Sequence, residues 1–493
     1  MQTEIIELLK QLGPGTMSAT AYDTAWVARL GDIDSDLSNH ALEWLNENQL
    51  PDGSWGAPAP NYYHDRVIST LAAMIALTYR GRRAHDRQQI EKGLIALERI
   101  TSEATKKLMA DPNGATIGFE MIVPNLVEEA ENLKLVKQQG QRILGRLSEL
   151  RKVKLQKMTG YKISRNVTMA FSAEMAGLDG QAMLDVDNIQ EENGSVGHSP
   201  SATSYFVRYI RTGDERGLKY LRSVISPDSS VPDLLPFEVY ERAWVLWNLS
   251  LVDSLDSTVI NHFQPHLDFL QSAWNPEKGI GLSVGFSVPD GDNTSVVFDL
   301  LTRHGKNIDR KGLLSFNEPD HFRCYALEAN SSISVNIHAL GALKRIGYES
   351  DHPLAKKIIA FLKRGQTPSG FWFDKWHISP CYTTAHAIIT CKGYADELIE
   401  PAVKWMLSIQ HANGSWGFYL QTAEETSYCL QALSVYRNRG GRIPPGILEK
   451  GADWLKKNRN PPYPLFWIGK GLYAGELVIR SAILSALMLV DRI

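Results

Sequence analysis

One short motif occurs three times in this chain, and its spacing restricts the possible fold more than any other feature. A glutamine is followed four positions later by a glycine and six positions later by a tryptophan. The copies are Gln49-Gly53-Trp55, Gln366-Gly370-Trp372 and Gln410-Gly414-Trp416. Glycine allows a tight turn, tryptophan can pack over it, and the glutamine amide can bond helix-end groups. Three copies of identical spacing predict a toroid of helical hairpins rather than a simple bundle.

Apolar residues recur at helical spacing along nearly the whole chain. Residues 5–12 mark one face of an N-terminal helix, and Ser38 is a candidate N-cap for a helix that carries Ala41, Leu42 and Leu45. Turns rich in Gly, Pro, Asn and Asp separate helices of about ten to fifteen residues. No convincing series of alternating, strand-like segments is present. The sequence therefore predicts an all-α protein.

Composition excludes several classes of protein. Of the 493 residues, 43% are hydrophobic, which is enough for a large core, and the net charge of −3 offers no electrostatic case for binding nucleic acid. Glu4 and Glu7 interrupt any signal peptide, and apolar runs such as residues 486–490 are too short to span a bilayer, so we expect a cytoplasmic protein. No CxxC pair occurs, and we expect buried free thiols at Cys324, Cys381, Cys391 and Cys429.

Several segments together resemble class II terpene cyclases. The three repeats look like the QW motifs of the squalene-hopene type and of the class II diterpene cyclases. The segment SATAYDTAW at 18–26 resembles the signature at the start of the diterpene cyclase γ domain, SPSATSYF at 199–206 resembles another γ-domain segment, and DKW at 374–376 also recurs in the family. The resemblance is closest to short bacterial members that make tuberculosinyl or kolavenyl diphosphate.

The resemblance implies two α/α-barrel domains with the active site between them. It assigns residues 1–16 and 230–493 to a β domain and residues 17–229 to an inserted γ domain. It also implies protonation-initiated cyclisation of geranylgeranyl diphosphate, with Mg²⁺ as cofactor and a downstream enzyme that processes the diphosphate. No Asp-Asp pair occurs in the chain, so a site that ionises the diphosphate is not expected. The alternatives are a drimenyl-type cyclase acting on farnesyl diphosphate and a non-catalytic helical-toroid binding protein.

The candidate acid is the segment Asp290-Gly291-Asp292-Asn293. Two carboxyls at i and i+2 can couple so that one keeps a proton at neutral pH, which protonation of an alkene requires. Such a string also fits a solvated turn. The segment stands where the family carries its DxDD motif, which implies that Asp292 is the proton donor. Asn293 replaces the last Asp of that motif.

The segment 331–343 supplies candidate partners for this acid. Asn336 and His338 diverge by about 200° on a regular helix, so both cannot be expected to reach one carboxyl. Small residues at Gly341 and Ala342 leave space beside His338. The resemblance implies an Asn or His hydrogen bond to the acid from this helix. We favour His338, with Asn336 second, and a core histidine is the alternative.

Candidates for binding the diphosphate are less distinct. Lys162 resembles a γ-domain lysine that binds diphosphate, although a solvated surface lysine fits the residues equally. Lys375 and Trp376 of the DKW segment are further candidates for contact with substrate. Acidic γ-domain residues could hold Mg²⁺ or simply form a solvated turn, and they are Asp185, Asp187, Glu191 and Glu192. We therefore assign no metal ligand.

Phe171 bears on the product. Residues 169–174 resemble a family segment of the form LHSLEG, whose His quenches the cyclised cation in many members. The resemblance places Phe171 at the position of that His. Phenylalanine cannot accept a proton, and its ring face stabilises a nearby cation. An ordinary buried apolar residue is the alternative. We therefore predict a rearranged halimadane or clerodane diphosphate and favour kolavenyl diphosphate.

Overall fold

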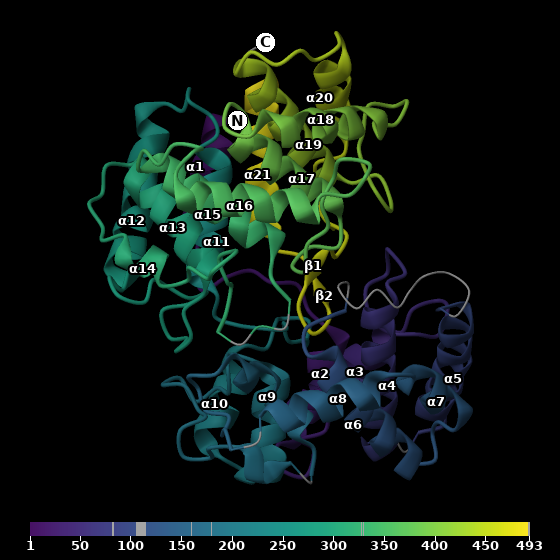
Figure 1. Cartoon of the computed structure of the whole chain (residues 1–493). Helices are drawn as coiled ribbons and strands as arrows, with labels where there is room; N and C mark the ends of the chain where they lie inside the picture. The colour runs from purple at the N-terminus through teal and green to yellow at the C-terminus, as the bar shows by residue number, and fades with distance from the viewer. Residues whose placement is uncertain are drawn as a thin grey trace.

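Two helical domains make up the molecule (Figure 1). The computed structural model describes residues 1–80, 83–104, 115–158, 160–178, 180–326, 328 and 330–491. One hydrophobic core joins residues 5–12 with residues 239–490, and a second lies within residues 21–231. We call these the β domain and the γ domain. Both chain ends lie on the β domain, so the γ domain is an insertion near the N-terminus (Figure 1).

Alternate helices of the β domain form a closed inner ring. In order around the ring they are α11 (Glu238–Leu249), α13 (Gly291–Arg303), α15 (Ile333–Arg345), α17 (Pro380–Cys391), α19 (Ala423–Asn438) and α21 (Glu476–Val490). Each packs against the next, and α21 packs against α11. The outer helices are α1 (Gln2–Lys10), α12 (Ser257–Ala273), α14 (Lys311–Leu314), α16 (Pro353–Gly365), α18 (Asp396–Ser408) and α20 (Ile447–Lys457). The result is an α/α barrel, as the sequence predicts.

The γ domain repeats this plan with shorter and less regular elements. Its inner ring consists of α2 (Ala21–Ala28), α4 (Tyr63–Arg80), α6 (Phe119–Asn132), the 3-10 helix η2 (Thr168–Ala176) and α9 (Pro200–Tyr205). Its other helices are α3 (Ser35–Glu47), α5 (Ala84–Ala104), α7 (Gln138–Leu144), α8 (Leu147–Lys157), η3 (Gln181–Met183), η4 (Phe206–Ile210) and α10 (Glu215–Ser223). The 3-10 geometry of η2 matters because this element carries Phe171.

Each Gln-Gly-Trp motif fastens a turn to the following outer helix. Gln366 Nε2 donates to the carbonyls of Gly370 and Leu398, both at 2.8 Å. Trp372 is fully buried, and its indole N–H donates to a carbonyl of α16 at 2.7 Å. Gly370 has a φ of 96°, and a Cβ there would lie 2.6 Å from the backbone of Pro401. The same bonds recur in the other two copies, so the motif builds the barrel.

A fourth turn of this geometry escaped the sequence comparison because Val196 takes the place of the tryptophan. Gln190 Nε2 donates to the carbonyl of Gly194 at 2.9 Å. Gly194 has a φ of 88° and packs against the backbone of Arg216. The amide of Val196 donates to Thr203 Oγ1 at 2.9 Å, as each motif tryptophan does to a threonine. The γ domain therefore contains a degenerate copy of the repeat.

Ser38 does not cap a helix, contrary to the prediction. Helix α3 begins three residues earlier, and the Asp34 side chain caps it by accepting from the amide of Leu37 at 3.0 Å. Ser38 lies inside the helix and donates to the carbonyl of Ala28 at 2.6 Å. The four cysteines are buried free thiols, as predicted. Among the described helices, none has both the length and the apolar character needed to cross a membrane.

A short hairpin joins the two domains. Strands β1 (Trp467–Ile468) and β2 (Leu472–Tyr473) pair antiparallel and reach from the β domain toward the γ domain (Figure 1). The carbonyl of Gly469 accepts from the amide of Ile117 at 2.8 Å, and the amide of Leu472 donates to Asp65 Oδ1 at 2.8 Å. The hairpin thus forms part of the wall between the domains.

Candidate active site

A cavity of about 700 Å³ lies between the domains. This volume falls within the range of about 300–1,000 Å³ that is usual for small-molecule sites. The γ domain contributes Met121, Met169 and Phe171 to its walls, and the β domain contributes the candidate acid. Aromatic rings dominate the β-domain side, and they are Phe237, Tyr240, Trp244, Phe286, Tyr325, Trp376, Trp467 and Tyr473.

The candidate acid motif forms the N-terminus of α13 rather than a solvated turn. Asp290 is the N-cap, and its Oδ1 accepts from the amide of Asn293 at 2.7 Å while its Oδ2 accepts from the side-chain Nδ2 of Asn293 at 2.9 Å. A Cβ at Gly291 would lie 2.2 Å from the carbonyl oxygen of Arg323, so the residue between the two carboxyls must be glycine. Asp292, in the first turn, lines the cavity.

Asp290 and Asp292 share a buried, poorly solvated environment. Burial, and to a smaller extent the charge of Asp292, raise the pKa of Asp290 to about 7, although the bonds from Asn293 act in the opposite direction. Because the two carboxyls interact, the proton belongs to the pair rather than to one residue. Asp290 therefore holds its proton below about pH 7.

His338 of α15 contacts the candidate acid directly. His338 Nδ1 lies 2.5 Å from Asp292 Oδ1, and both side chains are buried. Asn336, the second candidate, does not contact Asp292. Its Oδ1 accepts from the amide of Phe322 at 2.8 Å and its Nδ2 donates to the carbonyl of the same residue at 3.0 Å. The helical divergence of the two positions separates their roles, and Asn336 holds the segment beside α15.

A second histidine extends this pair and was missed in the sequence. His386 Nδ1, on α17, lies 2.8 Å from His338 Nε2. The His386 ring stacks on Trp247 with 4.2 Å between ring centroids and 17° between ring planes. Burial and the neighbouring His338 lower the pKa of His386 well below its usual range. The only available signal was a histidine on an otherwise apolar helix, which is usually a core residue.

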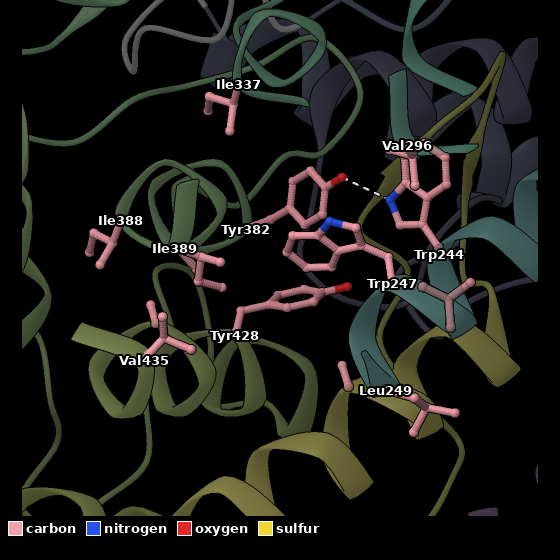
Figure 2. Close-up of a cluster of buried hydrophobic side chains, with 14 of the residues drawn as sticks. Trp244, Trp247, Leu249, Val296, Ile337, Tyr382, Ile388, Ile389, Tyr428 and Val435 are labelled. Carbon is pink, nitrogen blue, oxygen red and sulfur yellow. Dashed lines mark hydrogen bonds between the residues drawn. The ribbon is translucent and has the colours of Figure 1, made fainter. Parts of the chain in front are cut away.

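Large aromatic side chains pack against the two histidines. Figure 2 shows four aromatic residues of this part of the core, Trp244, Trp247, Tyr382 and Tyr428. Trp244 stacks on Tyr240 at 4.3 Å, and its indole N–H donates to the hydroxyl of Tyr382 at 2.9 Å. Trp244 also presents its ring at 5.7 Å from that of His338. The faces of such rings attract cations, so this wall suits a carbocation formed beside Asp292.

The DKW segment supports the site in a different way from the one predicted. Asp374 binds the N-terminal end of α15, the helix of His338, by accepting from the amide of Ile333 at 2.7 Å. Lys375 does not line the cavity, because its Nζ pairs with Glu328 Oε2 at 2.5 Å. Trp376 does line the cavity, and its indole N–H has no partner among the described residues.

The lysine predicted to bind diphosphate lies elsewhere. Lys162 is exposed and is not part of the cavity wall. Lys154 of α8 lines the cavity instead, where it pairs with Glu120 of α6. The N-terminal end of α6 opens on the same region, since Gly118 also lines the cavity. Lys162 follows Lys154 by eight residues, and only the packing of the two domains shows which of the two side chains faces the cavity.

The four acidic γ-domain residues that were left unassigned as metal ligands do not converge. Asp185 and Asp187 accept from Asn188 and Arg211, while Glu191 reaches across to the β domain and accepts from Ser287 Oγ at 2.6 Å. Glu192 is exposed. In the described parts of the chain, no group of three His, Cys, Asp or Glu side chains is arranged to hold a metal ion.

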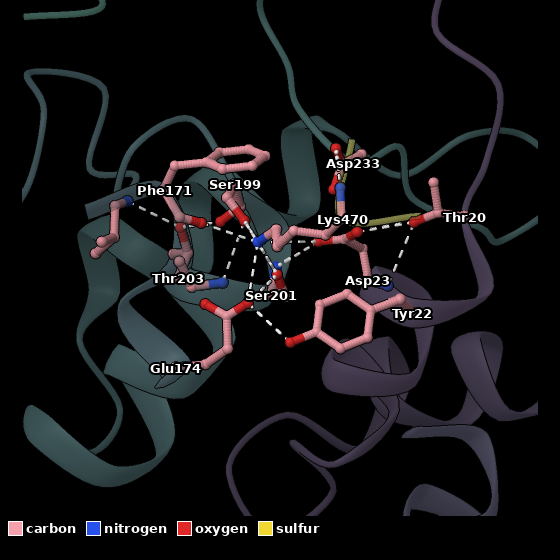
Figure 3. Close-up of polar contacts among 12 residues, drawn as sticks. Thr20, Tyr22, Asp23, Phe171, Glu174, Ser199, Ser201, Thr203, Asp233 and Lys470 are labelled. Carbon is pink, nitrogen blue, oxygen red and sulfur yellow. Dashed lines mark hydrogen bonds and ion pairs between the residues drawn. The ribbon is translucent and has the colours of Figure 1, made fainter. Parts of the chain in front are cut away.

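A buried lysine gathers both γ-domain signature segments (Figure 3). Lys470, from the hairpin, donates to Glu174 Oε1 at 3.1 Å, to Ser199 Oγ at 2.6 Å and to Ser201 Oγ. Asp23 Oδ1 lies 3.8 Å away. Burial lowers the pKa of Lys470, but the carboxylates of Glu174 and Asp23 outweigh it, so the net direction is upward. We call these five residues the Lys470 cluster. No motif in the sequence marks Lys470.

Phe171 separates the Lys470 cluster from the cavity. Its carbonyl accepts from Lys470 Nζ at 2.9 Å, and its ring lies 4.4 Å from the same nitrogen. The side chain also lines the cavity. Asp233 lies on the same side, and burial together with the charge of Asp23 raises the pKa of Asp233 well above its usual range. The ring thus screens the cavity from the buried cation.

Comparison with known proteins decides the family. A type B diterpene cyclase of Mycobacterium tuberculosis is 46% identical over 486 residues, which cover 97% of each chain. The chain belongs to the class II diterpene cyclase family. Residues 322–438 of the cyclase match the model of the squalene-hopene cyclase C-terminal domain. Ent-copalyl diphosphate synthase of Pisum sativum is 30% identical over 390 residues, which cover 76% of this cyclase but 46% of the plant enzyme. The cyclase therefore spans about half the length of this plant relative.

Solved structures agree with this assignment. Ent-copalyl diphosphate synthase from Streptomyces platensis superposes with a TM-score of 0.81 at 27% identity and covers 99% of both chains. The enzyme of the same name from Arabidopsis thaliana, at 22% identity and a TM-score of 0.69, shares the fold over 62% of its length. The predicted family, all-α fold and enzyme class are confirmed. The alternative of a non-catalytic binding protein is wrong, because the relatives are enzymes.

Proposed function

We propose that this cyclase uses Asp292 to protonate the terminal alkene of geranylgeranyl diphosphate and releases a bicyclic product that keeps its diphosphate. The observation that carries the proposal is a carboxyl that lines an aromatic cavity and is bonded to a histidine on its other side. The relatives named diterpene cyclase and copalyl diphosphate synthase favour a C20 diphosphate over farnesyl diphosphate. The absence of any Asp-Asp pair in the sequence supports retention of the diphosphate.

The proton is best placed on Asp292. Both oxygens of Asp290 accept hydrogen bonds from Asn293, an arrangement that favours the ionised form of Asp290. With His338 Nδ1 as the donor, Asp292 accepts at Oδ1, and Oδ2 is left to carry the shared proton into the cavity. The proton moves to the terminal alkene carbon, and two further alkenes close rings in turn, so that the positive charge moves to C8. His338 stabilises the carboxylate that remains on Asp292.

We propose that the diphosphate lies on the γ-domain side, where Lys154 lines the cavity beside the N-terminal end of α6. Lys162 remains the second candidate on its resemblance alone. Replacing Lys154 by Met should raise KM with a smaller effect on kcat, and replacing Lys162 by Met is the matched comparison. If only the Lys162 variant raises KM, Lys162 binds the diphosphate and Lys154 does not.

Mg²⁺ stays a prediction for this cyclase. The described residues do not form a carboxylate site for it, so no step above uses the ion. If Mg²⁺ takes part, we infer that it enters with the diphosphate oxygens it prefers. Turnover measured across a titration of EDTA and then of MgCl₂ tests this. A cytoplasmic location and a downstream diphosphate-processing enzyme also remain predictions.

We infer a rearranged clerodane or halimadane product, with kolavenyl diphosphate favoured. No histidine belongs to the cavity wall as described, and Phe171 stands at the position of the quenching histidine. A cation without a nearby base lives longer, so hydride and methyl shifts compete with deprotonation.

The direct test is incubation with geranylgeranyl and farnesyl diphosphate in parallel, followed by phosphatase treatment and product identification. We expect consumption of the C20 substrate and a rearranged bicyclic alcohol after phosphatase. Release of inorganic diphosphate, or consumption of farnesyl diphosphate alone, would contradict the proposal. Mainly unrearranged copalyl diphosphate would overturn the product assignment and leave the acid assignment standing.

A further inference from the structure

An aspartate bonded to a histidine does not ordinarily keep its proton. Ordinary pKa values of about 3.9 for Asp and 6.5 for His place the proton of such a pair on the imidazole. The pair would then be a carboxylate and an imidazolium, and Asp292 could not protonate an alkene. Something must therefore keep His338 neutral while its Nδ1–H still points at Asp292.

His386 is placed to do this. Its Nδ1 lies 2.8 Å from His338 Nε2, and only one hydrogen fits between two nitrogens at that distance. If the hydrogen belongs to His386, then His338 Nε2 is a bare acceptor and the one proton of His338 sits on Nδ1, facing Asp292. If the hydrogen belongs to His338, that ring either is an imidazolium or carries its one proton on Nε2, and in the second case the bare Nδ1 takes the proton of Asp292 into a hydrogen bond that points away from the cavity.

The surroundings favour the first arrangement. The ring of His386 is 1% exposed and packs against Trp247 and Tyr382, and its Nε2 has no partner among the described residues. When His386 donates to His338, the unpartnered Nε2 of His386 carries no hydrogen. When His338 donates instead, that Nε2 is a buried N–H without an acceptor, which is rarer in proteins. The imidazolium form of the second arrangement also creates two charges in an apolar site, at a cost in desolvation.

The titratable groups that face His386 give no reason for it to become charged. His338 lies on α15 and Tyr382 on its own helix α17, while Tyr428 lies on α19 at 6.0 Å between ring centroids. His377 is the remaining neighbour, and its Nε2 is already bonded to Glu424. Burial and the two other histidines keep the pKa of His386 low, so it stays neutral and keeps a single ring proton.

We propose that His386 is a positioning residue that donates to His338 Nε2, holds His338 neutral with its proton on Nδ1, and thereby leaves the acidic proton on Asp292. The inference rests on the proposed role of Asp292 as the acid. A residue that only packed against its neighbours would not set the protonation state of the His338 ring.

The test compares two variants. His386→Phe keeps a ring against Trp247 but removes the donor, and we expect kcat to fall at least about tenfold with little change in KM, as when a catalytic histidine loses its orienting partner. His386→Asn places an amide N–H near the position of Nδ1 and should restore much of kcat. Thr383→Val, one turn earlier on α17, is the control for packing and should behave as wild type.

The deciding measurement is ¹⁵N NMR of the histidine rings, assigned with the His338→Ala variant. Wild-type His338 should show one protonated and one bare nitrogen at the pH of activity, and the His386→Phe variant should shift it toward the doubly protonated form. A doubly protonated His338 in active wild-type enzyme overturns the inference even if the variants fail to fold. An unchanged kcat in folded His386→Phe does the same. Turnover by Asp292→Asn would instead remove the proposed function itself.

Discussion

Two buried polar clusters lie near the same cavity, one at its wall and one behind Phe171, and they use their carboxyls in opposite ways. In the Lys470 cluster, the carboxylates of Asp23 and Glu174 face a lysine that is fully buried between the domains. In the acid cluster, which consists of Asp290, Asp292, His338 and His386, the structure records no lysine or arginine bonded to the carboxyls among the described residues.

The difference shows that burial does not by itself make a carboxyl an acid. A buried cation fixes its partners in the ionised form, and breaking such a pair is costly, so the Lys470 cluster holds the domains together. A carboxyl bonded only by neutral donors keeps its proton within reach of the cavity. The γ-domain signature segments therefore belong to the Lys470 cluster, whose role is structural. The short Asp-Gly-Asp segment belongs to the acid cluster, for which we propose the chemical role.

The largest expected effect is on turnover by Asp292→Asn. An amide cannot deliver the proton, and loss of a general acid costs at least about 10²- to 10⁴-fold in rate. Turnover of geranylgeranyl diphosphate and the thermal unfolding curve should be measured together. Asp299→Asn, on the same helix but paired with Arg345, is the matched control and should retain activity. Near-normal turnover by folded Asp292→Asn would falsify its role.

His338→Ala should also lower kcat severely, because Asp292 loses the hydrogen bond that stabilises its carboxylate. Asn336→Ala tests the alternative partner and should act mainly on stability, since Asn336 bonds only backbone groups. Unchanged substrate consumption by His338→Ala, together with a severe loss in Asn336→Ala, would reverse this assignment.

Lys470→Met should act on stability rather than on the proton. It leaves Asp23 and Glu174 buried without a cation, which typically costs about 3–5 kcal/mol. Urea unfolding measures the loss. Lys456→Met removes an exposed ion pair with Asp491 and should cost at most about 1 kcal/mol. Equal midpoints for the two variants would mean that the Lys470 cluster does not join the domains.

Asn293→Asp should shift the pH dependence of turnover toward higher pH. The raised pKa of Asp290 means that Asp290 keeps its proton below about pH 7 and loses it above. If Asp292 draws on that proton, wild-type turnover should fall as pH rises through about 7. A carboxylate at 293 removes a donor to Asp290 and adds a like charge, which raises the pKa further and should shift this limb upward by about one unit. The exposed Asn438→Asp is the control. If the pH at which turnover falls is the same in Asn293→Asp and in the wild type, the two carboxyls Asp290 and Asp292 do not determine it.

The smallest effect on rate is expected for Phe171→His, which should change the product instead. The variant places a base at the cavity wall and should divert part of the product to an unrearranged or hydroxylated labdane. It also removes the ring over Lys470, so thermal stability must be checked. An unchanged product mixture from a folded variant would separate Phe171 from the control of rearrangement.

The sequence determined the features that depend on neighbours along the chain. Spacing alone predicted the helical toroid, because the glutamine, glycine and tryptophan of each motif act within one turn. The candidate acid Asp290-Gly291-Asp292 was predicted from two carboxyls two residues apart and from the resemblance to the DxDD motif, both of which are local in the sequence. Helical geometry likewise predicted that Asn336 and His338 would serve different partners.

Only the tertiary structure decided the contacts between distant segments. Asp23, Glu174, Ser199 and Lys470 meet because the hairpin enters the γ domain, and no spacing along the chain encodes this. His386 looked like any core histidine until α15 and α17 were seen to pack side by side. Lys154, and not Lys162, lies at the cavity wall. The packing of the two domains determines which lysine faces the space between them, and the motif around a lysine does not.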